Sequence, residues 1–257
     1  MTTMTGTAAG VPYTALPPAD GGPAPLLLTW HMLDAPRTDA AFAAALPMHG
    51  VPAWRVHLGM PMCGARMVDG TLNAVIALMR EDVVLAFLAP IVDQAVAEFP
   101  AALADLRAQL PITDGPISVL GGSLGGMVTL SVLTAPPAPV AAAALINPAI
   151  RLRSVVPLFP GTYPWTPAAE AAASRLDLLP HAPAITTSLL IVSGANDHPA
   201  FRTDAAALAA AAPQARLATI PDLAHPLAEE PGMDPAPQLP QTKAVDDVLT
   251  EWFSPRM

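Results

Sequence analysis

Short apolar runs alternate along the chain with segments whose apolar residues recur at helical spacing. Runs of four to eight apolar residues that end in Gly, Pro or polar residues are typical of buried strands, and longer stretches with i, i+3, i+4 spacing are typical of helices. The predicted strands cover residues 25–31, 53–58, 116–120, 140–146, 188–194 and 216–220, and the predicted helices cover residues 38–46, 91–110, 203–212 and 241–253. Because strands that alternate with helices form βαβ units, the pattern predicts an α/β fold with a mostly parallel central sheet flanked by helices.

Three segments depart from this alternation. Residues 1–24 are rich in Thr, Ala, Gly and Pro and predict at most one short edge strand, near residues 11–16. Pro100 interrupts the helical pattern of residues 91–110 and predicts a kink or a split there, since proline removes a helical hydrogen bond. Residues 83–92 form the most apolar stretch, but it is far too short to cross a membrane, so we expect a buried helix or a cap surface.

Residues 151–187 form the longest break in the alternation. They are rich in proline and carry Phe159, Tyr163 and Trp165. Ligands of α/β proteins bind beyond the carboxyl ends of the strands, where such a segment would form a wall. We therefore expect a cap or lid insertion here and a substrate with an apolar portion. No repeat or linker is visible, so we expect residues 1–257 to form a single domain.

Composition supports a well-packed enzyme domain and argues against nucleic acid as a partner. Hydrophobic residues make up 53% of the chain and charged residues 13%, which is enough to bury two helical layers against a sheet. The net charge is −9, and the 12 Lys and Arg residues are spread thinly. A protein that binds a phosphate backbone needs a basic patch, and this sequence offers none.

The amino-terminal sequence and the cysteine content favour a cytoplasmic protein. The first basic residue is Arg37, and residues 1–10 are too polar for the apolar region of a secretory signal. Cys63 is the one cysteine, so no intrachain disulfide can form, which fits a reducing compartment. Low Lys and high Ala, Arg and Pro usage resembles that of proteins from GC-rich bacterial genomes.

Residues 116–126 contain the first candidate for catalysis. Their β-branched apolar run ends in the pattern Gly-x-Ser-x-Gly, centred on Ser123, and a helical pattern follows. A strand that turns sharply into a helix holds one side chain in a strained, exposed position, and Gly121 and Gly125 allow the neighbouring backbone to come close. The segment therefore predicts a nucleophile elbow with Ser123 as the nucleophile.

A serine hydroxyl needs a base, and the base needs an orienting carboxylate. Asp197 lies three residues beyond the glycine that ends the strand at residues 188–194. His225 lies in the loop after the next strand, at residues 216–220. We therefore predict Asp197 as the acid and His225 as the base. His198, which is adjacent to Asp197, is the rival candidate for the base.

In this order of Ser, Asp and His, the chain resembles the α/β-hydrolase superfamily of serine esterases over residues 25–253. The matching segments are Gly121-x-Ser123-x-Gly125, Gly194-Ala-Asn-Asp197 and Asp222-Leu-Ala-His225. The resemblance implies the α/β-hydrolase fold, a Ser-His-Asp triad and acyl-enzyme chemistry.

The resemblance also implies an oxyanion hole. One donor is the backbone N–H of Leu124, which follows the nucleophile. The second comes from the loop after the strand at residues 25–31, where the family has His-Gly followed by the donor. Here His31 is followed by Met32 and Leu33. A one-residue shift makes Met32 the donor, which we favour, and a direct alignment makes it Leu33.

A further segment, residues 59–66, resembles the Pro-x-His-Gly-x-Arg segment of peptidase-like esterases, with Cys63 at the position of their His. In the dienelactone-hydrolase branch a cysteine is the nucleophile, but it occupies the elbow, which here holds Ser123. We therefore do not expect Cys63 to be a nucleophile. The spacing of His and Cys residues offers no metal site, and no Gly-x-Gly-x-x-Gly pattern indicates a nucleotide, so we predict no cofactor and no metal.

Together these features predict a cofactor-free serine hydrolase that cleaves a small-molecule carboxylic ester. Three alternatives stay open. The chain could be a catalytically silent hydrolase-fold protein that binds a small ligand or a partner, because Met32 replaces the glycine of the family and its side chain could crowd the oxyanion hole. It could be a thioesterase or a peptidase. It could catalyse a non-hydrolytic reaction, as a cofactor-free haloperoxidase or lyase. Neither the natural substrate nor the oligomeric state follows from the sequence.

Overall fold

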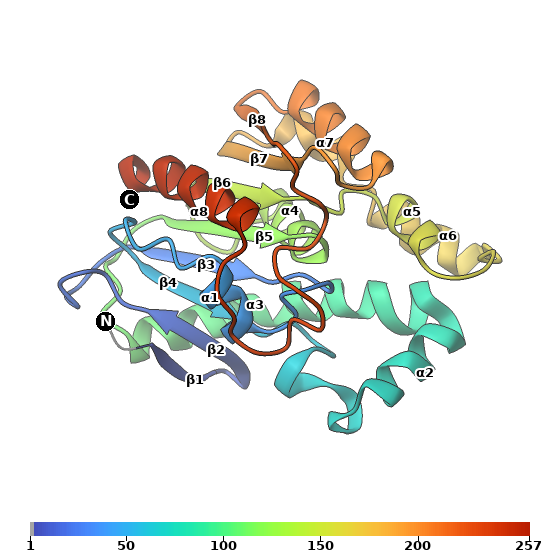
Figure 1. The fold of residues 1–257 in the computed structure, drawn as a ribbon, viewed down its shortest axis with the longest axis horizontal. Helices are drawn as coiled ribbons and strands as arrows, with labels where there is room; N and C mark the ends of the chain where they lie inside the picture. Colours follow the sequence, from blue (N-terminus) through green and yellow to red (C-terminus); the bar gives the residue numbers. More distant parts are fainter. Residues whose placement is uncertain (1–2) are drawn as a thin grey trace.

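The computed structural model describes residues 3–257, which form an eight-stranded sheet with helices on both faces (Figure 1). The strands are β1 (Met4–Ala8), β2 (Val11–Leu16), β3 (Leu26–Trp30), β4 (Trp54–Leu58), β5 (Ile117–Gly122), β6 (Val140–Ile146), β7 (Ser188–Gly194) and β8 (Ala215–Ile220). Their order across the sheet is β1-β2-β4-β3-β5-β6-β7-β8. The pairs β1–β2 and β2–β4 are antiparallel and all the others are parallel. The predicted α/β fold with a mostly parallel sheet is confirmed.

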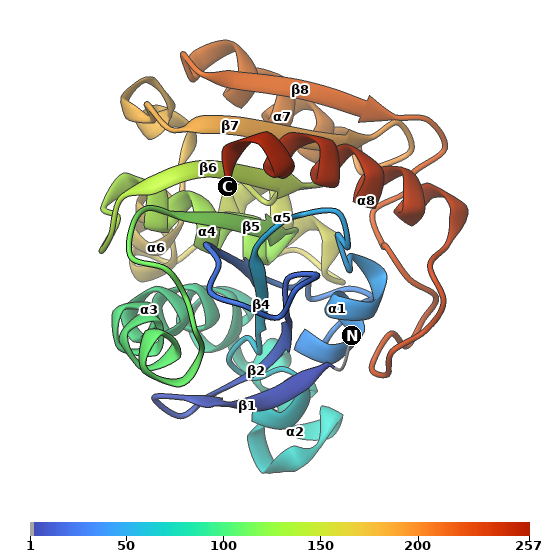
Figure 2. The same ribbon diagram turned by 90° about the vertical axis from the view of Figure 1, so that its left-hand side faces the viewer.

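Two helical layers cover the sheet, as Figure 2 shows from the side of α1 and α8. The helices are α1 (Asp39–Ala45), α2 (Leu72–Asp82), α3 (Ala89–Gln109), α4 (Leu124–Thr134), α5 (Leu152–Val155), α6 (Pro167–Arg175), α7 (Pro199–Ala211) and α8 (Pro240–Phe253). Short turns of other helix types are η1 (Gly64–Arg66), η2 (Val68–Gly70), η3 (Val83–Leu88), η4 (Val156–Leu158), η5 (Leu179–Ala184) and η6 (Ser254–Arg256). Helices α1 and α8 pack on one face, and α3, α4 and α7 pack on the other.

The central strands are apolar on both sides because each side meets a helical layer. In β5, Val119 belongs to the core under α3, α4 and α7, and its neighbour Leu120 belongs to the core under α1 and α8. Leu27 and Leu28 of β3 divide between the two cores in the same way. Side chains alternate along a strand, so a strand that is buried on both faces has a continuous apolar sequence, as these do.

The amino-terminal segment differs from the prediction of at most one edge strand. Residues 4–16 form an antiparallel hairpin, β1–β2, in which Ala8 pairs with Val11. The two-residue turn places Ala9 at φ 47° and Gly10 at φ 84°. Positive φ at both turn positions suits the right-handed twist of a hairpin, but Asn-Gly or Asp-Gly is its usual sequence signal. Ala9 occupies the position of that Asn or Asp, so the sequence pattern did not predict the hairpin.

Pro100 does not split α3, which runs unbroken from Ala89 to Gln109. Pro100 is exposed, whereas Phe99 and Leu103 beside it are buried against the core. Water can satisfy the carbonyl that loses its partner on the exposed side, while packing on the buried side holds the helix together.

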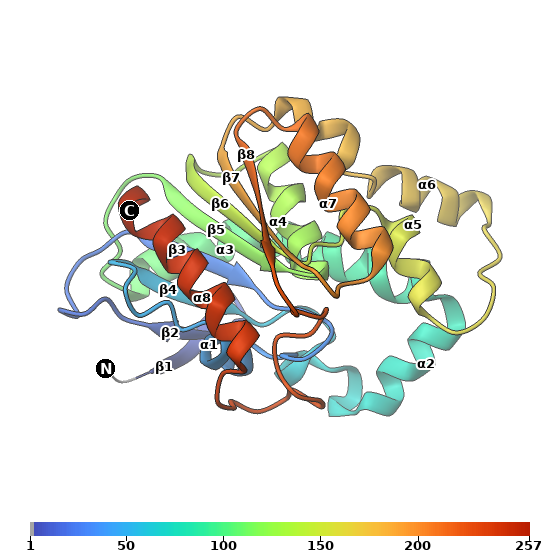
Figure 3. The same cartoon turned by 45° about the horizontal axis from the view of Figure 1, so that its top comes forward.

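Two segments lie beyond the carboxyl ends of the parallel strands, toward the right of Figure 3. One is residues 151–187, the predicted cap, which contains α5 and α6. The other contains α2, a helix that the sequence pattern did not predict, and η3, a π-helical turn that leads into α3. Residues 83–92 therefore form helix, as expected. None of the helices in residues 3–257 combines the length and apolarity needed to cross a membrane.

Candidate active site

Ser123 lies at the sharp turn between β5 and α4, with φ 48° and ψ −118°. This left-handed conformation is costly for a serine and is typical of a nucleophile elbow. A Cβ on Gly121 would stand 2.0 Å from the carbonyl oxygen of Gly125, and one on Gly125 would stand 2.4 Å from the carbonyl oxygen of Trp30. Both distances are far below van der Waals contact, so glycine is required on either side of Ser123.

Ser123, His225 and Asp197 form one hydrogen-bonded chain. His225 Nε2 lies 2.8 Å from Ser123 Oγ, and His225 Nδ1 lies 2.7 Å from Asp197 Oδ1. All three residues are buried, with exposed fractions of 4–5%. In the neutral imidazole with the proton on Nδ1, the Ser123 hydroxyl donates to Nε2 and Nδ1–H donates to Asp197. The structure thus brings together the three residues that the sequence singled out.

A second carboxylate, which the sequence did not single out, faces His225. Asp34 follows the β3 strand, and its Oδ2 lies 3.4 Å from His225 Nε2. Burial by itself lowers the pKa of His225, but Asp197 first and then Asp34 outweigh it and raise the pKa to about 9. Burial raises the pKa of Asp34, but the contact with His225, together with Arg37 and His198, lowers it below its usual value. Asp34 is therefore ionised at neutral pH.

Asn147 holds the loop that carries His225, and the sequence did not single it out either. It is fully buried at the carboxyl end of β6, with φ 42°. Its Nδ2 donates to the carbonyls of Ala224 (2.8 Å) and His225 (3.0 Å), and its Oδ1 accepts from Gly194 N–H (2.7 Å). The sequence signal that could have identified it is the Asn147-Pro148 pair, which directly follows the buried strand β6 at the carboxyl-end edge of the sheet, where the other site residues lie.

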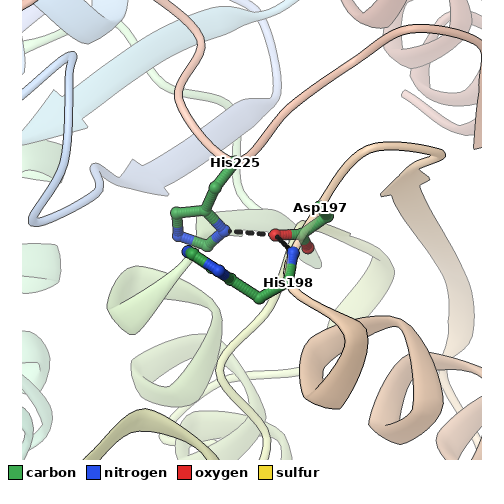
Figure 4. Close-up of side chains that lie close together, drawn as sticks. All are labelled: Asp197, His198 and His225. Atoms are coloured by element: carbon green, nitrogen blue, oxygen red, sulfur yellow. Dashed lines mark hydrogen bonds and ion pairs between the residues drawn. The ribbon is translucent and has the colours of Figure 1, made fainter. Parts of the chain in front are cut away.

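His198 lies beside His225 rather than against Ser123. The two imidazole rings are 5.1 Å apart between centroids, and the backbone N–H of His198 donates to Asp197 Oδ1 at 2.6 Å (Figure 4). Asp197, His198 and His225 offer three ligand atoms within 4.8 Å of one another, a set that a divalent ion could use. Asp197 and His225 are joined to each other by a hydrogen bond, so the contacts favour an acid–base pair over a metal centre.

The β3–α1 loop, which supplies the second predicted oxyanion donor, is held by His31. His31 is buried, its Nδ1–H donates to the Met32 carbonyl (2.7 Å), and its Nε2 accepts from Met60 N–H (3.0 Å). Burial lowers the pKa of His31 to about 4, so the ring is neutral. The side chain of Met32 is fully buried in the core against Gly122 and Phe42, and it does not line the cavity that opens at Ser123.

Backbone N–H groups at both predicted oxyanion positions are free. Leu124 is the first residue of α4, where a helix leaves its N–H groups without an internal partner. Within residues 3–257, the N–H groups of Leu124, Met32 and Leu33 donate to no other residue. The choice between Met32 and Leu33 as the second donor stays a prediction.

A cavity of about 420 Å³ opens at Ser123. Its walls are mostly apolar, and many of the wall residues come from α2 and from the end of α5 and the segment after it. These wall residues are Leu72, Val75, Ile76 and Met79 of α2, and Val155, Leu158 and Phe159. A second cavity of about 690 Å³ adjoins it, and the two share Ile76, Met79 and Phe159. Beyond that wall, the lining of the second cavity includes Tyr163 and Asp82, and the Tyr163 hydroxyl donates to Asp82 at 2.6 Å.

Cys63 lines the first cavity but is a poor nucleophile. Burial raises the pKa of its thiol to about 12, so the thiolate that would react is not formed at neutral pH. Arg66 of the same segment does not reach into the cavity. It donates to the Gly59 carbonyl at 3.0 Å and to Glu98 at 2.8 Å, and thereby ties this loop to α3.

No protein-family model matches the chain, and no curated protein matches it significantly. Solved structures match over nearly the whole chain. An esterase domain from a Rhodothermus marinus protein has 18% identity and a TM-score of 0.62, covering 98% of this chain and 96% of that chain. Est1E from Butyrivibrio proteoclasticus, solved with ferulic acid bound, has 16% identity and a TM-score of 0.65, covering 98% of each chain.

A third match is MGS-MChE2, described as an α/β hydrolase enzyme from the metagenome of lagoon sediments of Mar Chica, Morocco. It has 15% identity and a TM-score of 0.59, covering 98% of this chain and 99% of that chain. The chain has the α/β-hydrolase fold, as the sequence resemblance predicted.

Proposed function

We propose that the protein is a serine hydrolase that cleaves carboxylic esters of small molecules through an acyl-enzyme intermediate. The observation that carries the proposal is the hydrogen-bonded chain Ser123–His225–Asp197, which opens into a largely apolar cavity. The esterases among the structural neighbours support the same class of reaction.

The contacts of each residue suit one role in this reaction. The Ser123 Oγ attacks the ester carbonyl, and its proton moves to Nε2 of His225. Asp197 keeps the other proton on Nδ1 and stabilises the imidazolium. The Leu124 N–H, with an N–H of the β3–α1 loop, stabilises the negative charge on the carbonyl oxygen by about 3 kcal/mol per donor. His225 then returns the proton to the leaving alcohol, and water hydrolyses the acyl-enzyme.

The apolar cavity favours an acyl group or alcohol with an apolar portion. Each methylene buried there contributes about 0.8 kcal/mol of binding free energy. The competing function, a catalytically silent binding protein, rested on the risk that Met32 crowds the oxyanion hole. The Met32 side chain packs in the core instead, so that argument loses its support.

Labelling with a fluorophosphonate probe in the presence of EDTA tests the proposal. The probe forms a covalent bond only with an activated nucleophile, and EDTA removes any contribution from a metal ion. We expect labelling of the wild type and none of Ser123→Ala. The matched control is Ser131→Ala on the same helix, where the Ser131 hydroxyl bonds only the Met127 carbonyl at 2.8 Å, and it should be labelled like the wild type.

A panel of p-nitrophenyl esters, thioesters and amides of the same acyl group then identifies the reaction. Ester turnover that falls by roughly 10⁶ in Ser123→Ala is the expected result. A folded wild-type protein that is not labelled and turns over no substrate in the panel contradicts the proposal.

A further inference from the structure

His225 lies between two carboxylates, one at each ring nitrogen. Asp197 accepts from Nδ1 at 2.7 Å, and Asp34 Oδ2 stands 3.4 Å from Nε2, the nitrogen that also faces Ser123. A Ser-His-Asp triad needs only the carboxylate at Nδ1. Asp34 therefore adds a negative charge on the side of the ring where the proton is exchanged with the nucleophile and the leaving group.

We propose that Asp34 is a positioning residue of the reaction, which acts through His225 by stabilising its imidazolium form and so sets the pH range in which Ser123 is activated. This inference rests on the proposed function for its effect on catalysis, but the contact between the two side chains stands without it.

Two side-chain hydrogen bonds fix the backbone just before Asp34 and so hold its carboxylate near His225. His31 Nδ1–H donates to the carbonyl of Met32, and Arg37 Nη1–H donates to the carbonyl of Leu33 at 2.5 Å. These two bonds fix the peptide units directly before Asp34. The side chain of Asp34 is 45% exposed and lines the cavity, so a substitution there disturbs no core packing.

Arg37 is the cation nearest in sequence to Asp34, but its guanidinium is bonded to other groups, so Asp34 faces His225. Arg37 is paired with Glu230, with Nη2 to Oε2 at 2.7 Å, and also donates to the Pro231 carbonyl. The other groups that face His225 are Asp197, the imidazole of His198, the Ser123 hydroxyl and the apolar ring of Phe201, whose centroid is 5.0 Å away. None of these is a cation that is permanently charged, so the two carboxylates dominate the field at the ring.

The second carboxylate has opposite effects on two states of the reaction. When Ser123 adds to the ester, its proton moves to Nε2, and the ionised Asp34 stabilises the imidazolium until that proton passes to the leaving alkoxide. The same charge favours a proton on the imidazole of the resting enzyme, where the base must be neutral. The consequence is an enzyme that works best in alkaline solution, and removal of the charge moves the working range toward lower pH.

The test is an NMR titration of the His225 imidazole in the wild type and in Asp34→Asn, a substitution that keeps the shape and removes the charge. We expect the midpoint to fall by about one pH unit or more, the effect of one charge at this distance in a medium as polar as water. Asp34→Glu, which keeps the charge, should stay nearer to the wild type. Asp222→Asn is the matched control, because Asp222 is exposed on the same loop as His225 and makes no contact with its ring.

The pH profile of fluorophosphonate labelling is the second readout, and Asp34→Asn should move it toward lower pH by the same amount. A His225 midpoint that is equal in the wild type and in Asp34→Asn overturns the inference, whether or not the protein is active. If the midpoint moves and the folded wild type is never labelled, the contact of Asp34 with His225 is supported and the proposed function fails. If the midpoint moves and the labelling profile does not, the role of Asp34 in catalysis is overturned.

Discussion

Asn147 connects three segments that are far apart in the sequence, so its removal should loosen the site and destabilise the fold together. Its side chain makes three hydrogen bonds, to Gly194 N–H and to the carbonyls of Ala224 and His225. Asn147 is fully buried, so water cannot replace these bonds without entering the core. Asn147→Ala therefore leaves one donor and two acceptors without the partner they have in the wild type.

The expected loss follows from these three bonds. A buried hydrogen bond contributes about 1 kcal/mol net, so Asn147→Ala should lower the free energy of unfolding by about 3 kcal/mol. With a urea dependence of about 3 kcal/mol per molar, the midpoint of unfolding should fall by about 1 M. Ester turnover should fall as well, because the carbonyls of Ala224 and His225 lose the hydrogen bonds from Asn147 that help to hold the His225 loop in place.

Urea unfolding followed by circular dichroism measures this loss. The matched control is Asn196→Ala, which makes the same substitution at an exposed position between Gly194 and Asp197, and it should change stability by less than about 0.5 kcal/mol. A loss below about 1 kcal/mol in Asn147→Ala, or equal losses in both variants, would refute the reasoning.

Two further predictions concern the cavity and acid stability. Phe159→Ala removes part of the wall between the two cavities, so the preferred p-nitrophenyl ester should become longer, with a gain of about fourfold in kcat/KM per methylene that enters the second cavity. Leu158→Ala, which widens only the first cavity, should not lengthen the preference, and equal profiles in the two variants would contradict the interpretation. Burial lowers the pKa of His31 to about 4 and that of His57 to about 3, so both take up protons when the chain unfolds below their ordinary pKa of 6.5. The free energy of unfolding should therefore decrease by about 2 kcal/mol per histidine from pH 6.5 to pH 4.5, and urea midpoints that do not change over this range would contradict it.

The sequence predicted the parts of the fold whose pattern is local. Strands β3, β5, β6 and β7 are buried on both faces and so appear as continuous apolar runs. Ser123 and Asp197 come after β5 and β7, and His225 lies in the loop after the neighbouring edge strand β8, which made their meeting at one edge of the sheet predictable.

The parts that the sequence did not predict depend on distant contacts. Helix α2 has one buried residue, Val75, because most of its apolar side chains line a cavity instead of packing in a core. Strand β1 is an edge strand with an exposed, polar sequence. Asp34 and Asn147 are single polar residues that come after strands. Both contact His225, which lies 78 residues beyond Asn147 and still farther from Asp34. No local pattern marks such a pair.

The central claim is that Ser123 is a nucleophile activated by His225, and mass spectrometry of the probe-treated protein tests it most directly. After reaction with a fluorophosphonate and proteolysis, we predict one covalent adduct, on the Ser123 hydroxyl, and no adduct in Ser123→Ala or in His225→Gln. An adduct on another residue that persists in Ser123→Ala, or no adduct on folded wild-type protein, would contradict the account.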